Sequence, residues 1–250
     1  MSINDIQQAA AALQGDAVLC DDTLALRLGK CRIDMRSNSP ELLAELGDYF
    51  AHVVVPFDAS ADMQVVAIER EVADVGVEFT DWAREPGKTG RKDAYYDLPD
   101  ARLILKVRTG MLFLQSASLR MAAGPCRRYP NQVINFLNAQ YMNWLQNRDF
   151  LICHAAGLVF RGCAFGIAGF SGGGKSTLML RLLDHDEVNY LTNDRLFIRA
   201  NGDAPKAIGI AKLPRVNPGT IVHNPALHSL ISPQQREQLL ALPGCTSPAG

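Results

Sequence analysis

A glycine-rich stretch in the second half of the chain, AGFSGGGKST at residues 168–177, has the residue types with the clearest chemistry. Gly169, Gly174, Lys175 and Ser176 fit the spacing G-x-x-x-x-G-K-[ST], in which backbone N–H groups converge on phosphate oxygens. The lysine would reach the outer phosphates, and the serine hydroxyl would lie on Mg²⁺. The pattern predicts a nucleotide-binding loop formed by Gly169, Ser171, Gly172, Gly173, Gly174, Lys175, Ser176 and Thr177.

A flexible linker is the competing interpretation of these glycines. The flanks CAFGIAG and LMLRLL are too apolar for a linker, and they favour a strand before the loop and a helix after it. A second Gly-Lys-Thr, in PGKTG at 86–90, has Trp82 where the pattern needs glycine. We interpret that segment as a solvated basic loop, with contact to an acidic partner as the alternative.

Two further side chains could take part in chemistry at the loop. His154 lies 21 residues before Lys175, at the end of an expected strand that could run beside the strand of the loop. Asp194 lies 19 residues after Lys175, at the end of YLTND, where a carboxylate could reach Mg²⁺ or a substrate hydroxyl. The alternatives are a core histidine bonded to backbone and an aspartate that only stabilises a turn.

The segment CHAAGLVFRGCAFGIAGFSGGGKS, followed by TNDR, resembles the catalytic half of HPr kinase/phosphorylase and of the HPr kinase-related proteins. The resemblance covers roughly residues 150–200, and it is greatest for the group called HprK-related kinase B. It implies an ATP-dependent kinase that uses Mg²⁺ and phosphorylates a hydroxyl. The matching residues are His154, Gly169, Ser171, Gly172, Gly174, Lys175, Ser176, Asp194 and Arg195.

The sequence also departs from that family. Ala155 follows the histidine where the family has glycine, and Asn193 replaces the first aspartate of an Asp-Asp-Arg segment. An asparagine carbonyl can ligate Mg²⁺, but its amide cannot act as a general base. The family's E-x-R-G-L-G signature is absent; in its region Arg215 is a candidate phosphate contact. Residues 1–130 do not resemble the N-terminal domain of HPr kinase.

These residues predict phosphoryl transfer from ATP to the hydroxyl of a protein serine or of a small molecule. Asp194, His154 and Lys175 are the catalytic candidates, and Ser176, Asp194 and Asn193 are the Mg²⁺ candidates. The alternative is a nucleotide-binding regulatory module without kinase activity. A plain ATPase is disfavoured because no glutamate follows Asp194 to position water.

Local patterns predict the elements around these residues. Helices are expected at 2–13, at 40–53 with Ser39 as N-cap, at 131–147, at 175–184 and at 232–242, where Ser232 and Gln235 have capping-box spacing. Two strands are expected within 23–37 around a turn at Gly29, and a hairpin within 101–116 that turns at Thr109-Gly110. Further strands are expected at 63–69, 190–200 and 206–211, and 150–160 and 163–169 are interpreted as successive buried strands. Residues 83–100 are interpreted as a polar stretch, and NGD at 201–203 as a hairpin turn. We expect an α/β fold: a P-loop domain of HPr kinase type with antiparallel hairpins at 131–250, preceded by a smaller α+β region at 1–130 that could recognise the acceptor.

Composition narrows the class of protein. The formal net charge of −1 over 250 residues provides no field for nucleic acid or anionic lipid. No apolar run is long enough to span a bilayer, and the N-terminus lacks a secretory signal, so we expect a cytoplasmic protein with reduced cysteines. Only 75 residues follow Lys175, which predicts a shortened domain or a homo-oligomer that completes the sheet.

Overall fold

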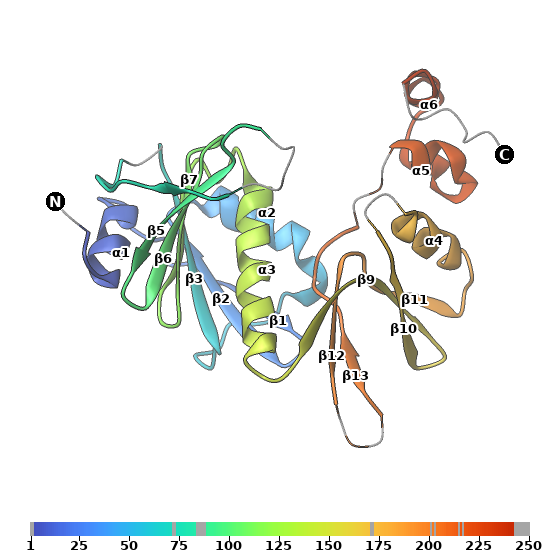
Figure 1. Ribbon diagram of the computed structural model, residues 1–250, viewed down its shortest axis with the longest axis horizontal. Coiled ribbons are helices and arrows are strands. Elements are labelled where there is room, and N and C mark those ends of the chain that lie inside the picture. Colours follow the sequence, from blue (N-terminus) through green and yellow to red (C-terminus); the bar gives the residue numbers. More distant parts are fainter. Residues whose placement is uncertain are drawn as a thin grey trace. The chain divides into compact units, whose positions relative to one another are not determined.

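The computed structural model describes residues 3–71, 74–83, 89–170, 173–200, 202, 204–214, 216 and 218–242. The chain divides into two compact units, Met1–Trp144 and Leu145–Gly250 (Figure 1). The sequence boundary was expected at 130/131, at the start of the long helix α3 (Pro130–Gln146). That helix packs on the first unit: the rings of Phe113 and Phe136 stack at 4.8 Å.

The N-terminal unit is built on one eight-stranded mixed sheet. Its strand order is β1-β2-β3-β8-β7-β6-β5-β4, in which only β2–β3 and β3–β8 are parallel. The strands are β1 (Leu24–Leu28), β2 (Cys31–Ser37), β3 (Met63–Glu69), β4 (Thr80–Asp81), β5 (Asp93–Leu98), β6 (Ala101–Lys106), β7 (Met111–Ser116) and β8 (Arg120–Gly124). The helices of this unit besides α3 are α1 (Ile6–Gln14), α2 (Pro40–Tyr49) and the short 3-10 helix η1 (Ala51–Val53).

The helices begin and end where local chemistry predicts. The Asp5 side chain accepts hydrogen bonds from the first turn of α1, and the helix ends at Gly15, whose φ of 55° suits glycine. Ser39 accepts a hydrogen bond from Leu42 N at the start of α2, with Pro40 in the first turn. The hairpin turns predicted at Gly29 and Gly110 are present, and both glycines have positive φ.

The two faces of this sheet are covered differently. Ile33 and Met35 of β2 are buried on the face that carries α2 and α3, as their alternation along the strand requires. On the other face, α1 packs on β7 and β8 and buries Leu103, Leu114 and Met121. Most of the fully buried side chains of the chain belong to this unit.

The C-terminal unit contains a five-stranded antiparallel sheet around β9 (Leu151–Phe160). On one side β9 pairs with β10 (Cys163–Ala168). On its other side it pairs with β11 (Val188–Thr192) along its second half and with β12 (Arg195–Arg199) along its first half. The hairpin partner of β12 is β13 (Lys206–Ile208). Since β10 and β11 are both antiparallel to β9, they run parallel to each other.

Four helical segments complete the C-terminal unit. They are α4 (Lys175–Leu182), α5 (Pro218–His223), the 3-10 helix η2 (Pro225–Leu230) and α6 (Pro233–Leu240). Met179 and Leu180 of α4 form a small core with Ala156 and Leu158 of β9. The predicted capping box of α6, between Ser232 and Gln235, is present. Among the described residues no helix has both the length and the apolar character to cross a membrane.

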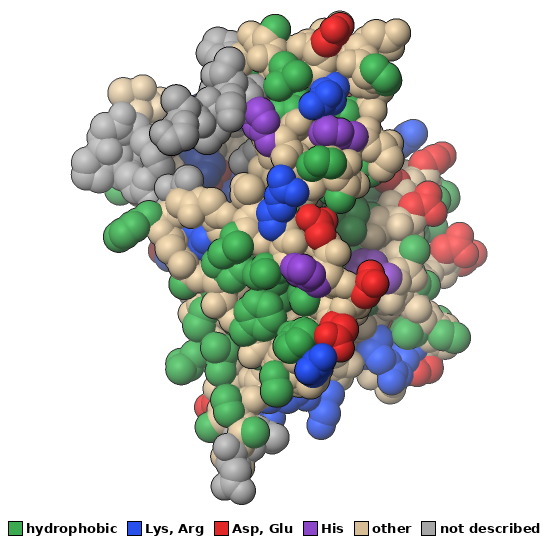
Figure 2. All heavy atoms as spheres, turned by 90° about the vertical axis from the view of Figure 1, so that its right-hand side faces the viewer, with side chains coloured by type: hydrophobic (Ala, Val, Ile, Leu, Met, Phe, Trp, Pro, Cys, Tyr) green, Lys and Arg blue, Asp and Glu red, His purple; other side chains and the backbone are tan. Residues whose placement is uncertain are grey.

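Four sequence expectations need correction. The stretch 83–100 contains a strand, β5, whose Ala94 and Leu98 are buried although polar residues surround them. The expected strand 190–200 is two strands, because the chain bends at residues 193–194. Strand β10 was expected to be buried, but it is an edge strand with mostly exposed side chains; β9 is also exposed near its start, where Leu151 is 73% accessible. On the face in Figure 2, hydrophobic side chains gather in one area.

Candidate functional site

The predicted loop and Asp194 lie at the same end of the second sheet, on either side of β9. In the β9–β10 pair Ala168 is opposite Ala155, so the loop begins where β9 has His154. On the other side of β9, Arg195 is opposite His154. The sequence had placed His154 at the end of its strand; it is the fourth residue of β9, and β9 does run beside the strand of the loop.

The loop turns directly into α4. Gly174 has a φ of 77°, which disfavours a side chain, and its carbonyl accepts the hydrogen bond from Leu178 N that opens the helix. Gly173 donates to Phe170 O at 3.1 Å, and a Cβ at Gly173 would lie equally close to that oxygen. Ser171 and Gly172 lie outside the described residues. The two glycines therefore allow a tight turn into a helix N-terminus.

Lys175 folds back over the start of the loop. Its Nζ donates to Gly169 O at 2.8 Å and to Phe170 O at 3.0 Å. A lysine ammonium has three donors, so these bonds hold the charge above the loop and leave a third donor. The first residue of α4 thus places its positive charge beside backbone N–H groups that have no partner within the helix.

Asp194 is the centre of a small charged cluster. Its Oδ1 lies 2.9 Å from His154 Nε2 and 3.3 Å from Arg195 Nη1. The carboxylate is 44% exposed and the histidine 58%, so the cluster is open to solvent. Both of these contacts are made to Oδ1, and they orient the carboxylate. Among the described residues, neither His154 nor Arg195 contacts Oδ2 in this way.

Asn193, beside this cluster, has an unsatisfied oxygen. Its Oδ1 is buried and accepts no hydrogen bond from the described residues. An acceptor left in that state costs about 1–3 kcal/mol, which a cation or a donor would recover. Amide, carboxylate and hydroxyl oxygens are the kind of ligand that Mg²⁺ takes, so Asn193, Asp194 and Ser176 have the right chemistry for this ion, although among the described residues no hydrogen bond joins Ser176 to the other two.

The remaining candidates differ in their surroundings. The Thr177 hydroxyl lies 3.2 Å from the Thr220 hydroxyl, which joins α4 to α5 and gives Thr177 a structural partner. Arg181 of α4 donates to His223 O at 2.9 Å and strengthens the same contact. Arg215 lies outside the described residues.

Three glycines that the sequence analysis did not single out support the site. Gly157 and Gly166 are paired across β9 and β10, and Leu196 lies so close that a Cβ on either would come within 2.9 Å of it. A Cβ at Gly209 would lie 1.9 Å from Leu191 O, so the chain after β13 packs directly on the backbone of β11. Glycine within strand patterns was the available signal, because it marks close backbone approach.

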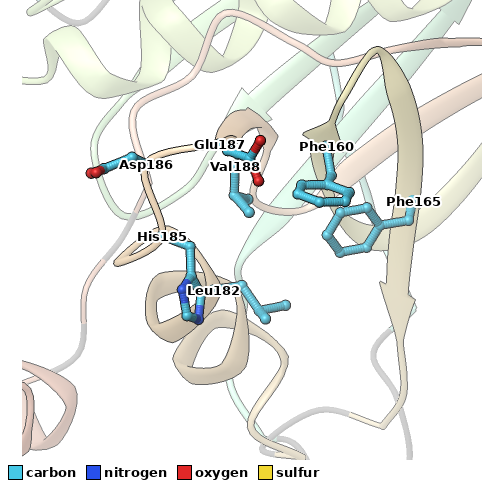
Figure 3. Close-up of a pocket in the computed structure, with 7 residues that line it drawn as sticks. All are labelled: Phe160, Phe165, Leu182, His185, Asp186, Glu187 and Val188. Carbon is cyan, nitrogen blue, oxygen red and sulfur yellow. The ribbon is translucent and has the colours of Figure 1, made fainter.

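A hollow in the surface lies at the other end of β9, β10 and β11, away from the glycine loop. It has a volume of about 420 Å³ and is lined mainly by apolar side chains. Figure 3 shows the rings of Phe160 and Phe165 side by side and facing Val188, while Asp186 points away. Arg161 pairs with Glu187 at 3.0 Å at its rim. This hollow lies near the Phe160–Cys163 hairpin, where β10 begins, whereas the glycine loop follows the end of β10. The hollow is therefore separate from the loop site.

Comparisons of this chain with known protein families, with curated proteins and with solved structures found no match.

Proposed function

We propose that the C-terminal unit is a P-loop kinase that transfers the γ-phosphoryl group of ATP to a hydroxyl. The observation that carries the proposal is the placement of Asp194 and the glycine loop at one end of the sheet, with only β9 between them. Nucleotide phosphates bound at the start of α4 would then lie between Lys175 and the carboxylate. Strand β10, the glycine loop and α4 follow one another in the chain, which is the order that such a loop requires.

In this proposal the protein mainly positions charge. The loop N–H groups and Lys175 hold the β- and γ-phosphates, with the lysine exchanging its loop carbonyls for phosphate oxygens. Ser176, Asn193 and Asp194 would hold Mg²⁺, which neutralises charge on the phosphates. Most of the rate comes from this positioning and from charge stabilisation.

Asp194 also receives the proton. The acceptor oxygen attacks the γ-phosphorus, the bond to the β–γ bridging oxygen breaks, ADP leaves, and the hydroxyl proton passes to the carboxylate. His154 is a positioning residue in this scheme, since its contact holds Asp194 Oδ1.

The test begins with calorimetry of ATP–Mg²⁺ binding to the parent protein, Lys175→Ala and Asp194→Asn. Loss of the lysine should weaken binding by about a hundredfold, because charge-assisted contacts to phosphate are lost. Lys206→Ala, an exposed lysine on β13, is the matched control and should bind as the parent does. A parent protein that fails to bind ATP–Mg²⁺ contradicts the proposal.

A regulatory nucleotide-binding module is the second candidate, favoured by Asn193 in place of the aspartate that the family resemblance leads one to expect. The two are separated by incubating the parent and Asp194→Asn with γ-labelled ATP and candidate acceptors. Label transferred by the parent and lost in Asp194→Asn supports the kinase. Binding of ATP–Mg²⁺ without transfer to protein or small-molecule hydroxyls supports the regulatory module.

A further inference from the structure

The N-terminal unit has a hollow on the part of its sheet that α1 does not cover. Val66 of β3 pairs with Met121, which belongs to the core under α1. Gln64, two residues earlier on the same face, pairs with Asp34 of β2, beyond that core. Here a hollow of about 930 Å³ opens, lined by Asp34, Arg36, Gln64, Phe57, Asp62 and Arg120 among others.

Asp34 is an unusual residue for the wall of this hollow. It is only 6% exposed, and its Oδ1 is buried and accepts no hydrogen bond from the described residues. Burial raises the pKa of this carboxyl, the Arg32 charge opposes that rise, and Asp58 adds to it. A buried carboxylate oxygen without a donor destabilises the fold, so the position needs an explanation other than packing.

The neighbouring arginines use their terminal nitrogens on other groups, and the buried Nε of Arg32 has no hydrogen-bond partner among the described residues. Arg32 pairs with Asp58 at 2.8 Å and donates to Pro56 O. Arg36 donates to Cys20 O at 3.3 Å. Arg120 donates to Ala117 O at 2.6 Å. The described part of the chain therefore places cations near Asp34 but supplies no hydrogen-bond donor to its Oδ1.

The lining of the hollow indicates what kind of ligand would fit. Four aspartates, Asp21, Asp22, Asp34 and Asp62, outnumber the two arginines, so the hollow favours a cation. Among the described residues no group of three or more His, Cys, Asp or Glu side chains is placed to hold a metal ion. Phe57, Ala59, Ala61 and Met63 add apolar surface, which a small organic cation would cover and a hydrated ion would not.

We propose that this hollow binds a small alkylammonium ligand whose charge pairs with the Asp34 carboxylate, with its carbon chain against Phe57 and Met63. The site belongs to the N-terminal unit and does not depend on nucleotide chemistry in the C-terminal unit. Ligand binding at the hollow can therefore be tested, and shown to be absent, independently of what the glycine loop binds.

A binding site and a structural carboxylate predict opposite effects of Asp34→Asn on stability. If Asp34 serves a ligand, removing its charge should raise the melting temperature by a few degrees, as is common when a binding-site residue is replaced. If Asp34 serves packing, the same change should lower it. Asp48→Asn, on the exposed face of α2, has the same change in net charge and is the matched control.

The experiment titrates ¹⁵N-labelled full-length protein with 1,4-diaminobutane and, separately, with the neutral analogue 1,4-butanediol. Saturable shifts of the Asp34, Arg36 and Gln64 amides with the diamine alone are expected. Asp34→Asn should weaken the interaction about tenfold or more, because a bond to a charged group is lost. Asp48→Asn should bind as the parent does.

Three results would overturn the proposal. The first is that the Asp34, Arg36 and Gln64 amides do not shift at a high concentration of the diamine. The second is that the diol binds as well as the diamine. The third is that Asp34→Asn binds the diamine as the parent does. Ala117→Trp, at the exposed rim of the hollow, provides a second variant that leaves Asp34 in place. It should block the diamine by filling the hollow, and unchanged binding in a folded Ala117→Trp protein also counts against the site.

Discussion

The two units of the chain differ in how completely they bury their apolar side chains. The N-terminal sheet is covered by helices on both faces and contains most of the fully buried side chains, such as Leu103 and Leu114. The C-terminal sheet has one small core under α4, an exposed edge strand β10 and an exposed start of β9. The residues that we propose to bind nucleotide lie in the less buried unit, on surfaces where substitution would change contacts with a ligand more than it changes packing.

The largest expected contrast between the units is in thiol chemistry. Burial raises the pKa of Cys126, in the N-terminal unit, from 9.0 to about 12, which lowers its thiolate fraction roughly a thousandfold. Cys163 at the start of β10 is exposed. Iodoacetamide at pH 8, followed by peptide mass spectrometry, should label Cys163 well before Cys126. Equal labelling of both would mean that the N-terminal core opens as readily as the edge of the second sheet.

A core substitution should show the same contrast in stability. Leu103 is fully buried in the N-terminal unit, and Leu103→Ala should lower the free energy of unfolding by about 2–5 kcal/mol. Leu178→Ala, on α4 of the C-terminal unit, removes a side chain that is 50% exposed and should change it by about 0.5 kcal/mol or less. Urea denaturation followed by far-UV circular dichroism measures both, whereas Trp82 and Trp144 would report only on the N-terminal unit. Comparable losses would show that α4 is packed far more tightly than its exposure indicates.

The smallest expected effect has the opposite sign. Gly47 lies inside α2, and the nearest atom to an added Cβ is Leu24 Cδ1 at 3.8 Å. Gly47→Ala should therefore stabilise the N-terminal unit by about 0.5–1 kcal/mol, since alanine favours a helix. Gly29→Ala is the control: its φ of 60° is unfavourable for a side chain, and it should destabilise. Thermal unfolding distinguishes the two, and a destabilised Gly47→Ala would contradict the packing described for α2.

Features set by neighbouring residues could be predicted from the sequence, and features set by distant ones could not. The caps at Ser39 and Ser232 and the turns at Gly29 and Gly110 depend on a few adjacent residues, and all were predicted. The apolar sequence of β10 gave no sign that it would lie at a sheet edge, because that depends on which strands pair.

The same limit holds at the two candidate sites. The glycine loop is contiguous in the sequence, so its turn into a helix could be read directly, although Ser171 and Gly172 lie outside the described residues. The contact of His154 with Asp194 joins residues 40 positions apart through the pairing of β9 and β12. Asp34 could not be singled out from the sequence, because it has the pattern of any polar residue that alternates along a strand. Only its burial and its place in the hollow distinguish it.

Strands β11 and β12 lie end to end along one edge of β9, and this restricts how the chain can change in length. Thr192 is opposite Gly157 and Arg195 is opposite His154, so the bend at Asn193–Asp194 holds the same number of residues as the strand it faces. One residue inserted or deleted there would turn alternate side chains of β12 to the other face and move Leu196 away from Gly157 and Gly166. For the fold, a change in the length of the bend is therefore more disruptive than a substitution within it.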